Sequence, residues 1–305
     1  MLPTGVMLPT DAMLPGDGRH ASRHTHHADH VTCAKGETTM PIIRVNGAGL
    51  YYEEHGTGPE TIVFAHGLLW SCRMFDDQVA ALKDRYRCIA FDFRGQGQSE
   101  VTRDGYDMET LYEDAAALIE ALDCAPCYFV GLSMGGFIAM RLAARRPDLV
   151  KSLVLLETSP DPEPAENIPK YRQLTFIARW LNIGLVVDRV MPIMFGQKFL
   201  NDPARAAQRS QWRQRMSKNH RVGVTRATMG VITRRGIYDE IAKIHVPVLI
   251  IVGDQDVATV PAKAERVHER IQGSRLVTIP GAGHTSTVEE PAAVNAAINE
   301  FLIGL

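Results

Sequence analysis

Long hydrophobic runs are absent from this chain of 305 residues. None approaches the ~20 consecutive apolar residues that a helix needs to cross a bilayer, so we expect no membrane-spanning segment. The formal net charge is only −2, and a balance this close to zero predicts no bulk attraction to nucleic acid or to membrane surfaces. With 45% hydrophobic and 22% charged residues, the composition is that of an ordinary soluble globular protein with a large core.

Cysteine is scarce and forms no framework. The five cysteines are odd in number and scattered, at Cys33, Cys72, Cys88, Cys124 and Cys127. This pattern predicts reduced thiols and a cytoplasmic location. The last two form C-x-x-C, for which a redox or zinc site is the alternative, but no second such pair and no ligand histidine pair accompanies them. We therefore expect neither a metal nor an organic cofactor.

The first 39 residues lack any strand or helix period. Met-Leu-Pro recurs every six residues and is followed by five histidines within 20–30. Large apolar groups are too few to order such a segment, so we expect 1–39 to be disordered, with the structured protein beginning near Met40. The segment also has no continuous apolar core or cleavage site of a secretory signal.

What the chain does contain is a strand that runs through G-x-S-x-G directly into a helix. The motif is Gly131-Leu132-Ser133-Met134-Gly135, after the apolar run 127–130. A serine on such a sharp turn adopts strained backbone angles, and the flanking glycines allow close backbone packing. Its hydroxyl is then presented at a helix N-terminus, where the dipole favours developing negative charge. This context predicts a nucleophile elbow with Ser133 as the nucleophile.

Two further polar groups follow later predicted strands. The run 246–252 ends in Gly253-Asp254-Gln255-Asp256, and the run 276–279 leads to Gly-Ala-Gly-His284. The carboxyl ends of parallel strands share one edge of a sheet, so these loops converge with the elbow. Serine, then aspartate, then histidine is the chain order of the α/β-hydrolase triad.

The chemistry explains the residue types. Ser133 is a weak nucleophile unless a base accepts its proton, and neutral His284 does this near its ordinary pKa. A carboxylate then holds the imidazole in the correct tautomer. Geometry alone leaves Asp254 and Asp256 open, and Glu157 at the end of an earlier strand is a third alternative.

A second oxyanion donor is expected after the strand 61–65. His66-Gly67 follows it, and Gly67 lets the backbone turn so that the N–H of Leu68 faces the Ser133 hydroxyl. Leu68 and Met134 would thus hold the oxyanion, with one such donor worth ~3 kcal/mol in the transition state. For His66 we expect a hydrogen bond to a nearby loop rather than proton transfer.

These motifs give the chain a resemblance to the α/β-hydrolase superfamily, in the branch of bacterial carboxylesterases, enol-lactone hydrolases and cofactor-free haloperoxidase-like enzymes. The matching residues lie within 40–305: His66-Gly67, Asp92 to Ser99, the elbow, Gly253 to Asp256, and Gly281 to His284 followed by Glu289-Glu290-Pro291. The resemblance favours Asp256 as the triad acid. A serine at the elbow sets the chain apart from epoxide hydrolases and haloalkane dehalogenases, which carry aspartate there.

The periodicity predicts an eight-stranded, mostly parallel sheet flanked by helices. Strands are expected at 42–45, 50–54, 61–65, 88–92, 127–131, 150–156, 247–252 and 274–279, with helices near 74–83, 108–122, 134–145, 261–271 and 290–302. The first two strands form a hairpin across Asn46-Gly47. Residues 40–159 and 241–305 are the core of this α/β-hydrolase fold, and 160–240 are a helical cap inserted after the sixth strand.

The cap is rich in bulky apolar residues and in arginine. An insertion at this place hangs over the catalytic edge, so we expect Trp180, Met194, Phe195 and Phe199 to roof the substrate pocket. From 201 to 235 the chain has nine basic residues against the single acid Asp202. Such a run predicts one solvated helix face, with steering of an anionic substrate as the alternative.

The sequence thus predicts a serine hydrolase that cleaves carboxylic esters of short to medium acyl chain through an acyl-enzyme. A lactonase, a perhydrolase and a non-catalytic ligand-binding module of the same fold are the alternatives. The expected partner is a small-molecule ester or lactone, with no nucleic acid and no membrane. The oligomeric state is left open.

Overall fold

The computed structural model describes residues 41–305, and the predictions for 1–39 and Met40 lie outside them. In the described part, eight strands form one sheet in the order β1-β2-β4-β3-β5-β6-β7-β8. Their bounds are β1 Ile42–Val45, β2 Ala48–His55, β3 Thr61–Ala65, β4 Arg87–Phe91, β5 Cys127–Leu132, β6 Val150–Leu156, β7 Val248–Gly253 and β8 Arg275–Ile279.

Strand β2 runs antiparallel to β1 and β4, whereas every other neighbouring pair is parallel. The β1–β2 hairpin turns at Asn46 and Gly47, whose φ angles are 44° and 73°. Two consecutive positive φ values are what a tight two-residue hairpin requires, and Asn-Gly supplies them at the smallest steric cost. The predicted eight-stranded, mostly parallel sheet and its hairpin are confirmed.

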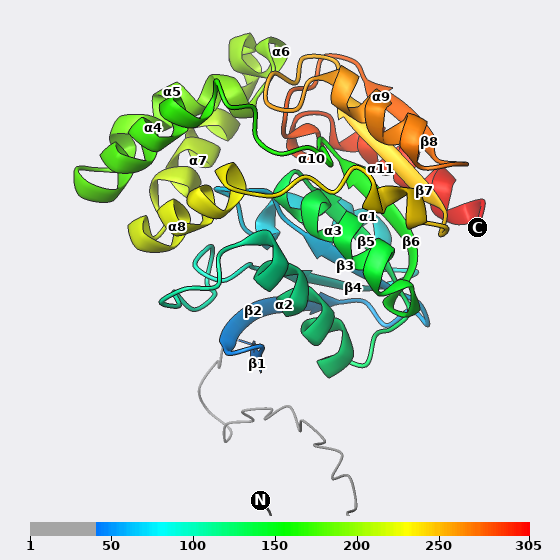
Figure 1. Cartoon of the computed structure of the whole chain (residues 1–305). Helices are drawn as coiled ribbons and strands as arrows, with labels where there is room; N and C mark the ends of the chain where they lie inside the picture. Colours follow the sequence, from blue (N-terminus) through cyan, green and yellow to red (C-terminus); the bar gives the residue numbers. More distant parts are fainter. Residues whose placement is uncertain (1–40) are drawn as a thin grey trace, which may run out of the picture.

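Helices cover both faces of the sheet (Figure 1). Alternate residues of β3 point to opposite faces of the sheet and pack into different hydrophobic clusters. Ile62 and Phe64 belong to one cluster, and Val63 and Ala65 belong to the other. The cluster of Ile62 includes residues of α1 (Asp76–Leu82) and α11 (Pro291–Ile303). The cluster of Val63 includes residues of α2 (Met108–Ala121), α3 (Met134–Arg145) and α9 (Pro261–Arg270).

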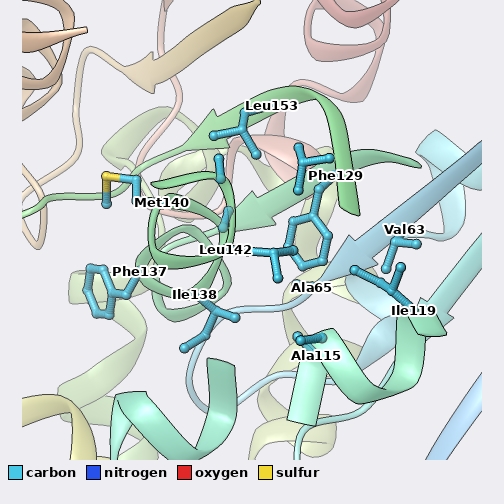
Figure 2. Close-up of a cluster of buried hydrophobic side chains, with 14 of the residues drawn as sticks. Val63, Ala65, Ala115, Ile119, Phe129, Phe137, Ile138, Met140, Leu142 and Leu153 are labelled. Atoms are coloured by element: carbon cyan, nitrogen blue, oxygen red, sulfur yellow. The ribbon is translucent and has the colours of Figure 1, made fainter. Parts of the chain in front are cut away.

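Helix α3 is the most deeply held of these helices. All of its residues from Met134 to Ala143 are buried. Figure 2 shows its side chain Leu142 beside Phe129 of β5, and Ile138 belongs to the same cluster as Val63 of β3. Packing on this scale fixes the helix that begins directly after Ser133, so the position of the serine is set by the core rather than by a loop.

Five α-helices lie between β6 and β7 and gather beyond one end of the sheet (Figure 1). They fall within the predicted cap span of 160–240. Their bounds are α4 Ile168–Trp180, α5 Gly184–Met194, α6 Gln197–Asn201, α7 Ala206–Ser217 and α8 Arg221–Ile232. The short elements are α10 (Ser286–Glu289) and the 3₁₀ helices Cys72–Phe75, Pro147–Leu149, Pro203–Arg205 and Glu240–Lys243. Across 41–305, no helix is both long enough and apolar enough to cross a membrane.

An aromatic cluster attaches the cap to the core. Phe195 stacks on Phe199 with ring centroids 4.6 Å apart, and Trp70 of the core lies 5.7 Å from Phe195. Trp212 of α7 meets the same Trp70 edge-on at 5.3 Å. Each side chain is almost wholly buried. Aromatic pairs of this kind add ~0.5–1.5 kcal/mol each to the burial of their area, so the cluster fixes one end of the cap.

Candidate active site

The turn from β5 to α3 is strained as a nucleophile elbow must be. Ser133 has φ 52° and ψ −110°, in a region that residues with a Cβ rarely adopt. The two flanking glycines make this turn possible. A Cβ on Gly131 would lie 2.4 Å from the carbonyl oxygen of Gly135, and one on Gly135 would lie 2.0 Å from that of Ala65. Any larger residue at either position would push the serine away from the sheet.

Three side chains from three strand ends form one hydrogen-bonded series. His284 Nε2 lies 2.9 Å from Ser133 Oγ, and His284 Nδ1 lies 2.8 Å from Asp256 Oδ2. The serine follows β5, the aspartate follows β7 and the histidine follows β8. The structure therefore brings together Ser133, Asp256 and His284, which the sequence analysis selected from segments up to 151 positions apart.

The structure also distinguishes between Asp254, Asp256 and Glu157, the three candidates for the carboxylate that binds His284. Asp254 accepts the N–H of Gly281 at 2.7 Å and makes no contact with His284. Glu157 is buried at the end of β6, but neither of its carboxyl oxygens has a hydrogen-bond partner among residues 41–305. Burial, reinforced by the charges of Asp256 and Glu289, holds the pKa of Glu157 well above its usual range. Glu157 is therefore a neutral acid, and Asp256 is the carboxylate on the histidine.

Asp256 is built to stay ionised although it is buried. Burial acts to raise its pKa, but the neighbouring His284 and hydrogen bonds from Thr259 outweigh burial, and the pKa lies below the usual aspartate value. Its Oδ1 accepts the N–H groups of Ala258 and Thr259 at 2.8 and 3.0 Å. Its Oδ2 faces the imidazole. Oδ2 also accepts the hydroxyl of Thr259 at 2.6 Å. Oδ1 is therefore bound by the backbone, and Oδ2 by the histidine and the threonine hydroxyl.

The predicted oxyanion donors lie beside the serine. A Cβ on Gly67 would stand 3.5 Å from Ser133 Cβ, so the loop after β3 touches the elbow. The N–H groups of Leu68 and Met134 donate to no residue in the described part of the chain. Gln96 holds this loop by accepting the N–H of Leu69 at 2.8 Å. Two backbone donors are thus left for an anionic oxygen at the serine.

His66 has the loop-binding role expected of it. Its Nδ1 lies 2.7 Å from the carbonyl oxygen of Gly67, and its Nε2 accepts the N–H of Phe93 at 3.0 Å. Burial lowers the pKa of His66, so the ring is neutral and both nitrogens are engaged. The histidine therefore holds the backbone that carries the predicted oxyanion donor Leu68.

A second buried carboxylate, Glu289, holds the loop that carries His284. Its Oε1 accepts the N–H groups of Gly283 and Thr285 at 3.0 and 3.1 Å, on either side of the histidine. Its Oε2 accepts the N–H of Gly196 in the cap at 2.8 Å. In the sequence, Glu289 stands out only within the segment Glu289-Glu290-Pro291 that resembles the family. It follows His284 by five residues, and this spacing alone indicates no role.

Replacing Glu289 with glutamine is expected to flatten the fall of stability at neutral pH. Burial raises the pKa of Glu289 from 4.5 to about 7, although three backbone N–H groups act to lower it. A raised carboxyl pKa stabilises the fold fully below pH 4.5, and this contribution of roughly 3 kcal/mol is lost as the pH rises through about 7. Between pH 5 and 8, the free energy of unfolding should therefore fall more in the wild type than in E289Q.

Urea denaturation at four pH values across this range measures the two slopes. E290Q is the matched control, because Glu290 is adjacent but forms its ion pair with Lys198 at the surface. We expect its slope to follow the wild type. Equal slopes in E289Q and the wild type would show that Glu289 does not titrate in this range.

A cavity opens above Ser133 and His284, between the core and the cap. Most of its wall is apolar, and half of the lining residues come from α4, α5 and α8. Of the four predicted pocket residues, only Met194 lines it. The other lining residues include Leu68, Leu132, Phe137, Tyr171, Leu174, Ile183, Val186, Val190, Val224, Glu163 and Arg234.

Three of the pocket predictions are wrong for two physical reasons. Phe195 and Phe199 are buried in the aromatic cluster with Trp70, so they attach the cap instead of facing the substrate. Trp180 is 67% exposed at the end of α4 and lines a separate surface groove with Phe176. Apolar character located these residues in the cap correctly, but it did not show which way each side chain faces.

The expectation of one solvated basic face is also wrong for part of the arginine run. Arg209 donates to the carbonyl oxygens of Phe199 and Asp202, and Arg213 pairs with Asp188. Arg226 reaches across to the carbonyl oxygen of Thr102. Arg234 is buried in the cavity wall. Arg209 and Arg213 thus bind other parts of the cap, whereas Arg226 links the cap to the core.

Comparison with known proteins agrees with the fold. The Alpha/beta hydrolase family matches residues 62–297. The chain is 34% identical over 260 residues to a putative non-heme bromoperoxidase, BpoC, of Mycobacterium tuberculosis, which covers 83% of this chain and 97% of that protein. Among solved structures, the enol-lactonase of Burkholderia xenovorans superposes with a TM-score of 0.81 at 28% identity, covering 86% of this chain and 100% of that one.

An esterase of Thermogutta terrifontis superposes with a TM-score of 0.78, also at 28% identity, over 84% of this chain and 94% of that one. The chain belongs to the α/β-hydrolase family. The predicted family and fold class are therefore confirmed. The names of these relatives differ in reaction, so the specific activity has to be argued from the site.

Proposed function

We propose that the protein is a serine hydrolase that cleaves carboxylic esters through an acyl-enzyme intermediate. The observation that carries the proposal is the series Ser133 Oγ, His284 and Asp256, with separations of 2.9 and 2.8 Å, at the floor of an apolar cavity. A nucleophile, a base and an orienting carboxylate at hydrogen-bond distances are the requirements of acyl transfer. The apolar wall suits an ester rather than a charged amine.

In the acylation step, Ser133 Oγ attacks the ester carbonyl carbon while His284 Nε2 takes the hydroxyl proton. The carbonyl electron pair moves onto oxygen, where the N–H groups of Leu68 and Met134 stabilise it. Asp256 stabilises the imidazolium that forms. The intermediate then collapses, the alkoxy group leaves with the proton from His284, and the acyl group stays on the serine.

Deacylation repeats these events with water as the nucleophile. His284 takes a proton from the water, the oxygen attacks the acyl carbon, and the serine leaves with the proton returned by the histidine. A lactone follows the same course, except that the alcohol remains tethered to the acid. Hydrogen peroxide in place of water would give a peracid by the same bond changes.

The test combines active-site labelling with a substrate panel. An organophosphonate should modify Ser133, and p-nitrophenyl acetate should be turned over with a burst of nitrophenol when deacylation is slower. The panel then compares esters, lactones and peroxide acceptors. Labelling without turnover of any member would favour a ligand-binding module, and a lactone turned over far faster than every ester would favour the lactonase.

Short acyl chains, about C2 to C6, are expected to be the best substrates. Each buried CH₂ adds ~0.8 kcal/mol of binding until the pocket is full. The apolar wall of this cavity is interrupted by Glu163 and Arg234, so the gain ends early. Values of kcat/KM for acetate, butyrate, octanoate and palmitate esters measure the profile, and an optimum at C12 or beyond would contradict it.

The same series at two ionic strengths tests substrate steering by the cap. Because several of its arginines are bound to the protein itself, we expect kcat/KM for an anionic lactone to change little with salt. A steep fall with added salt would instead support attraction of anionic substrates.

A further inference from the structure

The cavity over the catalytic serine contains a second polar group. Two charged side chains line it, Glu163 from the segment after β6 and Arg234 from the segment after α8. They form an ion pair of 2.9 Å between Arg234 Nη1 and Glu163 Oε2, with both side chains about nine-tenths or more buried. Neither forms a hydrogen bond or an ion pair with Ser133, Asp256 or His284. A buried ion pair costs desolvation energy and is weak evidence of stabilisation by itself, so its place in a substrate cavity requires a reason.

Arg234 keeps one nitrogen free for a ligand. Its Nε donates to the carbonyl oxygen of Asp161 at 3.0 Å, and Nη1 donates to Glu163 and to the carbonyl oxygen of Val231 at 2.8 Å. Its Nη2 has no hydrogen-bond partner in the described part of the chain, yet it is not among the fully buried atoms that lack one. Nη2 therefore retains accessible surface on a residue that lines the cavity.

The guanidinium is held at a fixed place relative to the nucleophile. It stacks 4.3 Å from the ring centroid of Phe137. Phe137 lies one turn into α3, and its N–H donates to the carbonyl oxygen of Ser133 at 3.0 Å. Four residues of helix correspond to roughly 6 Å along the axis. A group bound at Arg234 would therefore lie several bonds from a carbonyl carbon attacked by Ser133.

Tyr171 adds a second donor to this part of the wall. It lines the same cavity, and within 41–305 the hydrogen bonds of Tyr171 are made by its backbone, to Asn167 and Thr175, and not by its hydroxyl. Burial, with a further contribution from Glu163, raises the pKa of Tyr171, so the hydroxyl is protonated at neutral pH and can donate. Two donors without partners in the described residues thus belong to side chains that line a mostly apolar cavity. Their complement is an acceptor oxygen.

We propose that Arg234 Nη2 and the Tyr171 hydroxyl form a subsite for an acceptor oxygen on the substrate, several bonds from the ester carbonyl. This subsite rests on the proposed ester hydrolysis and narrows its substrate class to esters with a second oxygen function. Glu163 already balances the charge of Arg234, so the subsite favours a neutral carbonyl oxygen over a carboxylate, which would add an uncompensated negative charge. Arg234 and Tyr171 are specificity-determining residues under this proposal.

Paired substrates of equal length test the subsite. Methyl 4-oxopentanoate, 5-oxohexanoate and 6-oxoheptanoate are compared with methyl pentanoate, hexanoate and heptanoate, in which CH₂ replaces the keto group. The measured quantity is the ratio of kcat/KM within each pair. We expect one oxo ester to exceed its plain partner by roughly 10- to 100-fold, because a hydrogen bond to a charged donor is worth one to two decades.

Two variants and a control assign the preference to these residues. R234M should reduce the ratio to near one, and Y171F, which removes a hydroxyl with no partner in the described structure, should reduce it by roughly threefold to tenfold. R235M is the matched control, since Arg235 is adjacent, exposed and absent from the cavity wall. It should keep the wild-type ratio. Because each ratio is internal to one variant, partial loss of folded protein cancels.

The outcomes separate this subsite from the proposed function. If the wild type turns over no ester and Ser133 is not labelled, ester hydrolysis itself is wrong. If plain esters are hydrolysed but every ratio is near one, or R234M and Y171F keep the wild-type ratio, only the subsite is wrong. The monomethyl ester of a dicarboxylic acid completes the panel. A preference for this anion that is lost in R234M would support the acceptor subsite and overturn its bias toward neutral oxygen.

Discussion

Replacing Ser133 with alanine is expected to abolish ester hydrolysis, with kcat lower by roughly 10⁶-fold. In the proposed mechanism the hydroxyl oxygen forms the acyl bond, and among residues 41–305 its only side-chain hydrogen bond is to His284. The next oxygen in the hydrogen-bonded series is on Asp256, which contacts the opposite nitrogen of the imidazole from Ser133. Active-site titration followed by steady-state turnover of p-nitrophenyl acetate measures the loss.

The fold of S133A is expected to be unchanged. Ser133 is held by backbone bonds, from its own N–H to Leu156 and from Phe137 to its carbonyl oxygen, and alanine keeps both. The melting temperature should therefore stay close to the wild-type value. S274A is the matched control, because Ser274 bonds to His268 outside the cavity and should have no effect on turnover. Substantial activity in purified S133A would mean that hydrolysis proceeds without an acyl-serine.

The sheet and the elbow could be predicted because their signals are local. Strand β6 has the expected bounds of 150–156, and α3 those of 134–145. Apolar runs bounded by glycine define such elements without knowledge of their neighbours. The elbow adds a steric requirement at Gly131 and Gly135 that few other structures impose. For the sheet and the elbow, the spacing of residues in the sequence is therefore enough to predict where they lie in the fold.

The spacing in the sequence does not decide whether Asp254 or Asp256 is the partner of His284. Both follow β7 by a few residues, and the outcome depends on a turn in which Asp256 folds back onto the N–H groups of Ala258 and Thr259. That turn directs one oxygen to His284 and leaves Asp254 to Gly281 at the surface. The family resemblance, rather than the spacing, selected the residue that the structure places on the histidine.

The cavity wall could not be read from the sequence. Apolar residues in a multi-helix cap can face the core, the substrate cavity or solvent. Here Phe195 is buried against the core, Met194 lines the cavity and Trp180 is exposed. Glu163 and Arg234 meet across 71 positions of sequence with no motif between them. In the sequence, nothing distinguishes Arg234 from the other eight basic residues of 201–235. The fold distinguishes it by burying its side chain. Its environment, and so its chemistry, is a tertiary property.

Replacing Asp256 with asparagine is expected to lower kcat by roughly 10⁴-fold while Asp254→Asn has little effect. The asparagine amide has one stable orientation here. Its oxygen must stay at the Oδ1 position to accept the N–H groups of Ala258 and Thr259, so its NH₂ takes the Oδ2 position facing His284 Nδ1. That NH₂ donates to Nδ1 and shifts the imidazole proton to Nε2.

A proton on Nε2 blocks the base that Ser133 needs, since this nitrogen lies 2.9 Å from the serine hydroxyl and must be free to accept from it. Asp254→Asn keeps an oxygen acceptor for the N–H of Gly281 and leaves the imidazole untouched. Burst and steady-state kinetics with p-nitrophenyl acetate measure both variants, and a melting curve verifies that each is folded. Should D254N lose activity while D256N retains it, the triad acid would be Asp254, and the hydrogen bond of Asp256 to the histidine would have no part in catalysis.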